Sequence, residues 1–293
     1  MYNAMESPSE ADALMYQSTR QLKPTGGFSL VELSIVLVII GLLVGGILAG
    51  RSLIRASELR AVGSEYQRYL TASNAFRDKY FALPGDMTNA TQFWGRLNSN
   101  ADCVTNSSPA TAVATPGACD GNGNRLVLAS AAASQSGEIF QYWRHLANAG
   151  LIEGSYTGIA GSGGASHAVG GENAPISRLN PGIWATYTWG DTSADLNLFD
   201  SSYGNALRMG GASTGAAPNN NLVKPEEMWN VDKKLDDGMP ALGKILVRSR
   251  VTCAVAADGT ALTTSAGDAA KLDAIYNLSN ATTQCAFVFR QAY

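Results

Sequence analysis

The sequence predicts an α+β protein in which one long N-terminal helix packs on an antiparallel β-sheet. An apolar stretch at 28–49 continues into an amphipathic helical pattern that ends near Tyr80. The candidate strands all follow this helix, between 183 and 290. Strands that are gathered after one long helix favour a sheet that packs on that helix. The chain has 293 residues, enough for one large domain or two modest ones.

The composition excludes several classes of protein. Hydrophobic residues make up 45% and charged residues 15% of the chain, which argues against a disordered polyelectrolyte. The formal net charge is -3, so the chain lacks the basic excess that nucleic-acid binding requires, and we expect no nucleic-acid partner. Because the chain has only 2 histidines, a histidine-rich metal site is excluded.

The apolar segment Phe28 to Ala49 contains 22 residues and a single charge, that of Glu32. As a helix it would span about 33 Å, enough to cross a hydrocarbon core of about 30 Å. A carboxylate at depth costs at least about 2.5–3.5 kcal/mol, so such a residue is functional by default. The alternative is that Glu32 lies near the membrane surface and snorkels to water.

A Gly-Gly pair precedes the apolar segment, with Arg20 and Lys23 upstream. A glycine at this boundary leaves the backbone open to a protease. The stretch Gly27-Phe28-Ser29-Leu30-Val31-Glu32-Leu33 and the apolar helix after it resemble the type IV prepilin signature, which pilins and type II secretion pseudopilins share. The resemblance is strong over roughly residues 24–55 and weaker beyond them.

The resemblance implies how the N-terminus is processed and used. A membrane aspartyl peptidase, the prepilin peptidase, would cut after Gly27 and N-methylate Phe28 as the mature N-terminus. Glu32 would be the assembly carboxylate, which meets the N-terminal amine of a neighbouring subunit in a medium of low dielectric constant. The implied partners are the peptidase, other pilin subunits and an inner-membrane assembly platform. The implied location is the bacterial inner membrane, then a periplasmic or cell-surface filament.

The patterns, together with the resemblance, imply four segments: a leader at 1–27, a membrane and assembly helix at 28–50, an amphipathic stem helix at 51–83, and a periplasmic or extracellular globular domain at 84–293. The leader departs from the family pattern because it is long and contains three acidic residues. Met15 offers a shorter, basic leader without acids, and we expect that translation starts there.

The stem is predicted from apolar residues that recur every three or four positions. We expect the stripe to be core that packs on a sheet: Leu59, Val62, Tyr66, Tyr69, Leu70, Phe76 and Tyr80. Pro84-Gly85 ends the helix. Together with the resemblance, this long helix implies a pilin-like fold.

Five further elements are predicted in the globular part. Helices are expected at Glu138 to Ala149 and from Pro225 to about Lys234, each with acids in its first turn. Strands are expected at Ile183 to Trp189, Lys244 to Val251 and Ala286 to Arg290. The segments 152–182 and 190–221 read as long, glycine-rich loops.

The four cysteines allow three disulfide pairings. We favour Cys103–Cys119 and Cys253–Cys285, because each cysteine then pairs with its nearest neighbour in the chain. Such loops contribute about 3 kcal/mol each in the loop-entropy description. The chain has no C-x-x-C pair, so redox catalysis and a zinc ribbon are not expected.

Two acidic turns are candidate calcium sites, although a plain turn is the favoured interpretation of both. Asp120, Asn122 and Asn124 alternate as in a calcium loop, but Arg125 and Ala131 occupy the positions of the turn glycine and the bidentate glutamate. Asp236-Asp237-Gly238 is the second. No cofactor is otherwise expected.

No catalytic residue is predicted. His145 sits on a predicted helix without a nearby base, and the loop Ser162 to His167 is rich in glycine. The chain contains no Walker A or H-E-x-x-H pattern, so we expect no enzymatic activity. The expected function is a structural subunit of a type IV pilus-like filament, a minor or specialised pilin. The alternatives are a pseudopilin of a type II secretion system and a bitopic membrane protein with a periplasmic ligand-binding domain.

Overall fold

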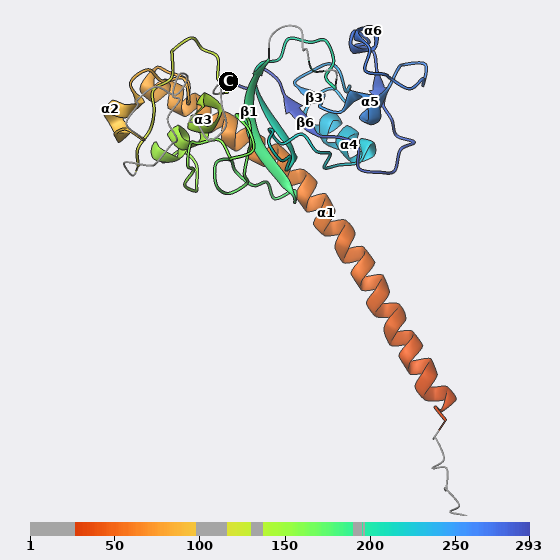
Figure 1. Ribbon diagram of the computed structural model, residues 1–293. Coiled ribbons are helices and arrows are strands. Elements are labelled where there is room, and N and C mark those ends of the chain that lie inside the picture. The colour runs from red at the N-terminus through yellow and green to blue at the C-terminus, as the bar shows by residue number, and fades with distance from the viewer. Residues whose placement is uncertain (1–26, 98–115, 130–136, 190–194, 196) are drawn as a thin grey trace, which may run out of the picture. The chain divides into compact units, whose positions relative to one another are not determined.

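The long N-terminal helix is the first element of the fold. The computed structural model describes residues 27–97, 116–129, 137–189, 195 and 197–293. The chain divides into two compact units, Met1–Arg51 and Ser52–Tyr293. Helix α1 (Leu30–Tyr80) is continuous over 51 residues, so it begins in the first unit and ends in the second (Figure 1).

The stem part of α1 supplies the aromatic stripe that the sequence predicts. Val62, Tyr69 and Phe76 are at most 1% exposed and belong to the main core. The ring of Tyr66 stacks on Phe289 with centroids 4.3 Å apart. The ring of Tyr69 meets that of Trp184 edge-on at 5.4 Å. The stripe therefore packs on a β-sheet, as the sequence predicts.

The sheet has four antiparallel strands in the order β1-β2-β6-β3. Their bounds are Gly182–Trp189 for β1, Gly204–Gly211 for β2, Phe287–Phe289 for β6 and Ile245–Val247 for β3. A separate pair is formed by β4 (Ala254–Val255) and β5 (Ile275–Tyr276). The α+β architecture with an antiparallel sheet on one long helix is thus confirmed.

The register of the strands separates two buried faces. Leu207 is paired with Phe289 and Met209 with Phe287, and all four side chains belong to the core that includes the stripe of α1. Val288, which alternates to the opposite face, forms a smaller cluster with Leu198, Tyr203, Ala206 and Leu246. Both faces of the sheet are therefore covered.

Within the described residues, five shorter helices complete the fold: α2 (Ala90–Trp94), α3 (Glu138–Asn148), α4 (Pro225–Leu235), α5 (Arg250–Cys253) and α6 (Ala266–Ala269). The predictions for α3, α4, β1 and β6 are confirmed to within about two residues. Helix α3 lies toward the β1 edge of the sheet and α4 toward the β3 edge (Figure 1).

Two sequence predictions for the globular part are wrong. The segment 190–221 contains β2, a buried inner strand between β1 and β6, although it was expected to be loop. The strand expected at Lys244 to Val251 ends at Val247 instead. There the chain leaves the sheet, because the N–H of Arg250 donates to the carbonyl of Asn197 and α5 begins.

The turn after α1 requires glycine at one position. Gly85 has φ +86°, and a Cβ atom there would collide with the carbonyl oxygen of Glu138. The first turn of α3 therefore approaches the backbone of Gly85 more closely than any side chain would allow. This close approach places α3 against the end of the stem.

Candidate functional site

The predicted processing site lies just before α1. Gly27, Phe28 and Ser29 precede the helix in non-helical conformation, and the Phe28 side chain is 90% exposed. A Cβ atom built on Gly27 would meet no atom within 4 Å. Among the described residues, nothing in the fold itself therefore demands glycine at position 27.

Ser29 and Glu32 cap the N-terminus of α1 reciprocally. The N–H of Ser29 donates to Oε2 of Glu32 at 2.8 Å, and the N–H of Glu32 donates to Oγ of Ser29 at 3.1 Å. This is a capping box, which satisfies two N–H groups at the start of the helix. Sequence reasoning missed it, although the signal was present as Ser-x-x-Glu before an apolar run. In the single chain the Glu32 carboxylate therefore already has a hydrogen-bond donor.

The first part of α1 is apolar on all sides. Every large apolar side chain from Phe28 to Leu48 is at least 50% exposed in the chain. By length and composition, α1 is able to cross a membrane, with a mean hydropathy of 2.7 over its most apolar window. A helix that is apolar all round requires lipid or partner helices around it.

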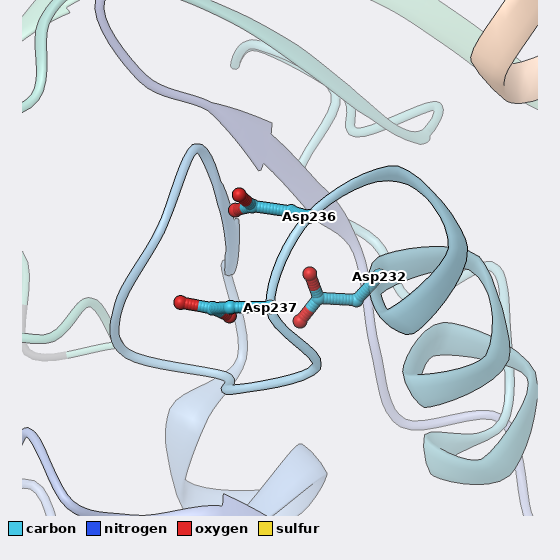
Figure 2. A group of neighbouring side chains, drawn as sticks. All are labelled: Asp232, Asp236 and Asp237. Atoms are coloured by element: carbon cyan, nitrogen blue, oxygen red, sulfur yellow. The ribbon is translucent and has the colours of Figure 1, made fainter.

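The second candidate calcium turn belongs to a larger acidic group. Asp232, in the last turn of α4, lies next to Asp236 and Asp237 of the following loop (Figure 2). One carboxylate oxygen of each residue lies within 4.8 Å of the other two. The sequence analysis named Asp236 and Asp237 but missed Asp232, which is one helical turn earlier.

The three acids differ in burial and in hydrogen bonding. Asp232 is fully buried, Asp236 is partly buried and Asp237 is exposed. Burial raises the pKa of Asp232 to about 7. The hydrogen bonds from Tyr276 and the backbone of Gly238 oppose this rise, whereas the charges of Asp237 and Asp236 add to it.

The first candidate calcium turn has its oxygens engaged by the protein. Asp120 accepts hydrogen bonds from N and Oγ1 of Thr91 at 2.8 and 2.9 Å, one on each carboxylate oxygen. Oδ1 of Asn122 accepts from the N–H of Asn124, and Oδ1 of Asn124 accepts from that of Leu126. These are Asx turns, in which the side-chain oxygens stabilise the backbone.

One of the two expected disulfides is observed. Cys253 and Cys285 are bonded, with Cα atoms 5.1 Å apart. Cys119 is buried in the core, but Cys103 lies outside the described residues. The Cys103–Cys119 pairing therefore stays a prediction.

Sequence reasoning missed a buried carboxylate in the stem. Glu65 is 6% exposed and accepts three hydrogen bonds: from Oγ of Ser177 at 2.6 Å, from the N–H of Arg178 at 2.9 Å, and from Nε1 of Trp184 at 2.7 Å. These donors come from β1 and the loop before it. No local pattern in the stem identifies this acid as buried.

His145 has the structural role that its sequence context predicts. Its ring is fully buried, Nδ1 accepts from the N–H of Gly85 at 3.0 Å, and Nε2 lies 3.2 Å from the carbonyl of Cys119. This pattern assigns the proton to Nε2. Burial lowers the pKa of His145 to about 3, so the ring is neutral.

One serine lies in a pattern that hydrolases use. Gly211-Ala212-Ser213-Thr214-Gly215 matches G-x-S-x-G, but a nucleophile elbow joins a strand directly to a helix. Here β2 ends at Gly211, and a turn that joins no helix follows. Ser213 therefore lacks the backbone context of a nucleophile.

Comparison with known families found one match. A family described as the prokaryotic N-terminal methylation motif matches residues 22–48. These residues include Gly27, Phe28 and Glu32, so the chain has the N-terminal methylation motif typical of type IV pilins and pseudopilins. Neither a curated protein nor a solved structure matches the chain.

Proposed function

We propose that this chain is a structural subunit of a type IV pilus-like filament, made as a prepilin and assembled through its N-terminal helix. The observation that carries the proposal is the methylation motif at 22–48, placed at the start of a continuous 51-residue helix. The motif implies processing by a prepilin peptidase, and it is typical of structural subunits without enzymatic activity. In this proposal Gly27 precedes the cleaved bond, Phe28 becomes the methylated N-terminus, and Glu32 directs assembly.

The proposed location follows from the same segment. The apolar part of α1 anchors the subunit in the inner membrane before assembly, with residues 84–293 in the periplasm. In the filament, apolar helices of neighbouring subunits replace lipid around one another. The exposed side chains from Phe28 to Leu48 then become buried between subunits.

The finer assignment is a minor or specialised pilin. Residues 85–293 form a part of 209 residues, which is large for a major pilin. Its long loops offer surface that the filament core does not need. A type II secretion pseudopilin shares the methylation motif and is the second candidate, since the motif is typical of both classes.

The intact mass of the non-reduced protein from native cells tests this proposal. We expect a mass that begins at Phe28, increased by one methyl group and decreased by four hydrogens for two disulfides. A mass that retains residues before Gly27 would reject the proposal and favour a bitopic membrane protein with a periplasmic ligand-binding domain. Deletion of the pilus assembly platform, compared with deletion of the secretion platform, then separates pilin from pseudopilin. For a pilin, only deletion of the pilus platform abolishes recovery of the subunit in sheared filaments. For a pseudopilin, only deletion of the secretion platform does so.

A further inference from the structure

The acidic group at the end of α4 has oxygens without hydrogen-bond donors. Oδ2 of Asp232 accepts from the hydroxyl of Tyr276 at 2.6 Å. Oδ1 of Asp232 is buried and accepts no hydrogen bond of ordinary geometry from the described residues, although the backbone N–H of Gly238 is near enough to the carboxylate to lower its pKa. A buried oxygen without a donor costs about 1–3 kcal/mol, and more when it is charged. A cation bound at this oxygen would offset that cost.

The two neighbouring acids also leave oxygens available. Oδ2 of Asp236 accepts from the N–H groups of Lys244 and Ile245, the latter at 3.0 Å. Oδ1 of Asp237 accepts from the N–H of Met239 at 2.8 Å. These backbone donors fix the orientation of both carboxylates. Each carboxylate keeps a second oxygen for another ligand.

The group lacks an ion-pair partner among the described residues. Over the part of the chain that the structure describes, no ion pair involves Asp232, Asp236 or Asp237. The nearby ammonium of Lys233 lies over the ring of Trp229, 4.6 Å from its centroid. Three carboxylates within 4.8 Å of one another repel strongly unless a cation or protons neutralise them.

We propose that Asp232, Asp236 and Asp237 together bind one Ca²⁺ ion. Calcium binds oxygen at 2.3–2.6 Å, so two oxygens on opposite sides of the ion can be about 5 Å apart. One carboxylate oxygen of each residue lies within 4.8 Å of the other two, so the fold brings all three oxygens close to the span of one calcium coordination sphere. Mg²⁺ requires shorter bonds and near-octahedral geometry, so an all-protein carboxylate site on a loop suits Ca²⁺ better. Backbone carbonyls and water would complete the six to eight ligands that calcium takes.

The ion would join two parts of the globular unit. Asp232 belongs to α4, whereas Asp236 is hydrogen-bonded to the first residue of β3, Ile245. A shared ion would therefore fix the loop between α4 and the sheet edge. Gly243 allows this loop to close, because its φ is +70° and a Cβ atom there would collide with the Asp236 carboxylate. This proposal concerns the globular unit and does not depend on filament assembly.

Calcium titration of the full chain in detergent, first treated with EGTA, tests the proposal. We expect Ca²⁺ to raise the melting temperature by several degrees, and Mg²⁺ at the same concentration to raise it less. Asp237→Asn is the variant of choice because Asp237 is exposed. The side-chain amide oxygen that the substitution introduces can still accept from the N–H of Met239. We expect this variant to fold normally and to lose calcium affinity by at least about tenfold.

Two matched variants control for general charge effects. Asp273→Asn removes an exposed acid elsewhere, and Asp120→Asn alters the other candidate turn. Both should bind Ca²⁺ as the wild type does. Equal calcium responses in wild type and Asp237→Asn, or no response of the wild type at millimolar Ca²⁺, would overturn the proposal. A response to Mg²⁺ that equals that to Ca²⁺ would overturn the assignment of the ion.

Terbium luminescence gives a second readout that does not depend on stability. Tb³⁺ replaces Ca²⁺ at oxygen sites and emits when a nearby tryptophan is excited. Nε1 of Trp229 lies 3.6 Å from the position of a Cβ atom on Gly238, which is adjacent to Asp237. We expect emission that Ca²⁺ displaces and that Trp229→Phe abolishes. Emission that persists in Asp237→Asn would place the bound ion elsewhere and reject the site.

Discussion

The carboxylate of Glu65 accepts a hydrogen bond from the indole Nε1 of Trp184 at 2.7 Å, which joins the stem of α1 to strand β1. Both residues are buried. Around this bond, the ring of Trp184 also contacts Tyr69 and Phe289. The packing of the stem on the sheet thus combines an apolar stripe with one specific polar link. The link fixes where along the helix the sheet sits.

Trp184→Phe should destabilise the globular unit by about 1–3 kcal/mol, because Glu65 loses one of its three donors while buried. The free energy of unfolding in urea measures this. Trp94→Phe is the matched control, since Trp94 is partly buried and donates no hydrogen bond to the described residues from its indole. Equal losses in the two variants would show that ring size, and not the hydrogen bond, matters.

The sequence predicted the elements that have strong local patterns. The stripe of α1 and the alternation in β1 are periodic, and α3 and α4 have acids in their first turns. Strand β2 was missed because it begins and ends with glycines (Gly204, Gly210 and Gly211) and has the polar residues Asn205 and Arg208 between them. It is a strand because β1 and β6 pair with it on both sides, which is a tertiary effect.

The candidate functional residues also show that local sequence patterns predict only what is close together in the chain. Gly27, Phe28 and Glu32 lie within six consecutive residues, so one motif identifies all three. Asp232 and the donors of Glu65 are brought together only by folding. Glu65 and Ser177 are 112 residues apart, and no pattern within the stem indicates that this acid is buried. Long-range polar contacts of this kind cannot be read from local periodicity.

His145 should make the fold sensitive to acid. Its pKa is about 3 in the fold and near 6.5 when unfolded, so the unfolded state binds the proton first as the pH falls. Stability is therefore full above pH 6.5 and is lost progressively toward pH 3. The slope approaches 1.36 kcal/mol per pH unit as the pH falls below 6.5, so the loss between pH 6.5 and 5 is about 1–2 kcal/mol. Protonation of Nδ1 would also point a ring N–H at the N–H of Gly85, which donates to that nitrogen in the fold.

Urea unfolding of wild type and His145→Gln at pH 7 and pH 5 tests this effect. Glutamine cannot titrate, so the variant should lose less stability between the two pH values than the wild type loses. His167→Gln replaces the other histidine, which lies in a partly exposed loop, and should keep the wild-type difference. An unchanged difference in His145→Gln would assign the acid sensitivity to other groups.

Gly27→Val should leave an uncut precursor in the membrane. Because a Cβ on Gly27 meets no described atom within 4 Å, the substitution fits the fold, and any loss of cleavage reflects the peptidase. Immunoblots of membrane fractions, followed by intact mass, measure the uncut fraction. Thr25→Val is the control, since it changes the leader but keeps the Gly27–Phe28 bond. Normal processing of Gly27→Val would argue against the proposed cleavage site.

Glu32→Ala should be processed but should not enter filaments, because the proposed pairing with a neighbour's N-terminal amine is lost. The capping box complicates this test, since alanine also removes the acceptor of the Ser29 N–H. Two further variants separate the effects. Glu32→Gln keeps a capping acceptor without the charge, and Ser29→Ala removes the other half of the box but keeps the charge. We expect Glu32→Gln to be excluded from sheared filaments and Ser29→Ala to be incorporated. The opposite pattern would mean that Glu32 acts by capping α1, and the charge pairing would be rejected.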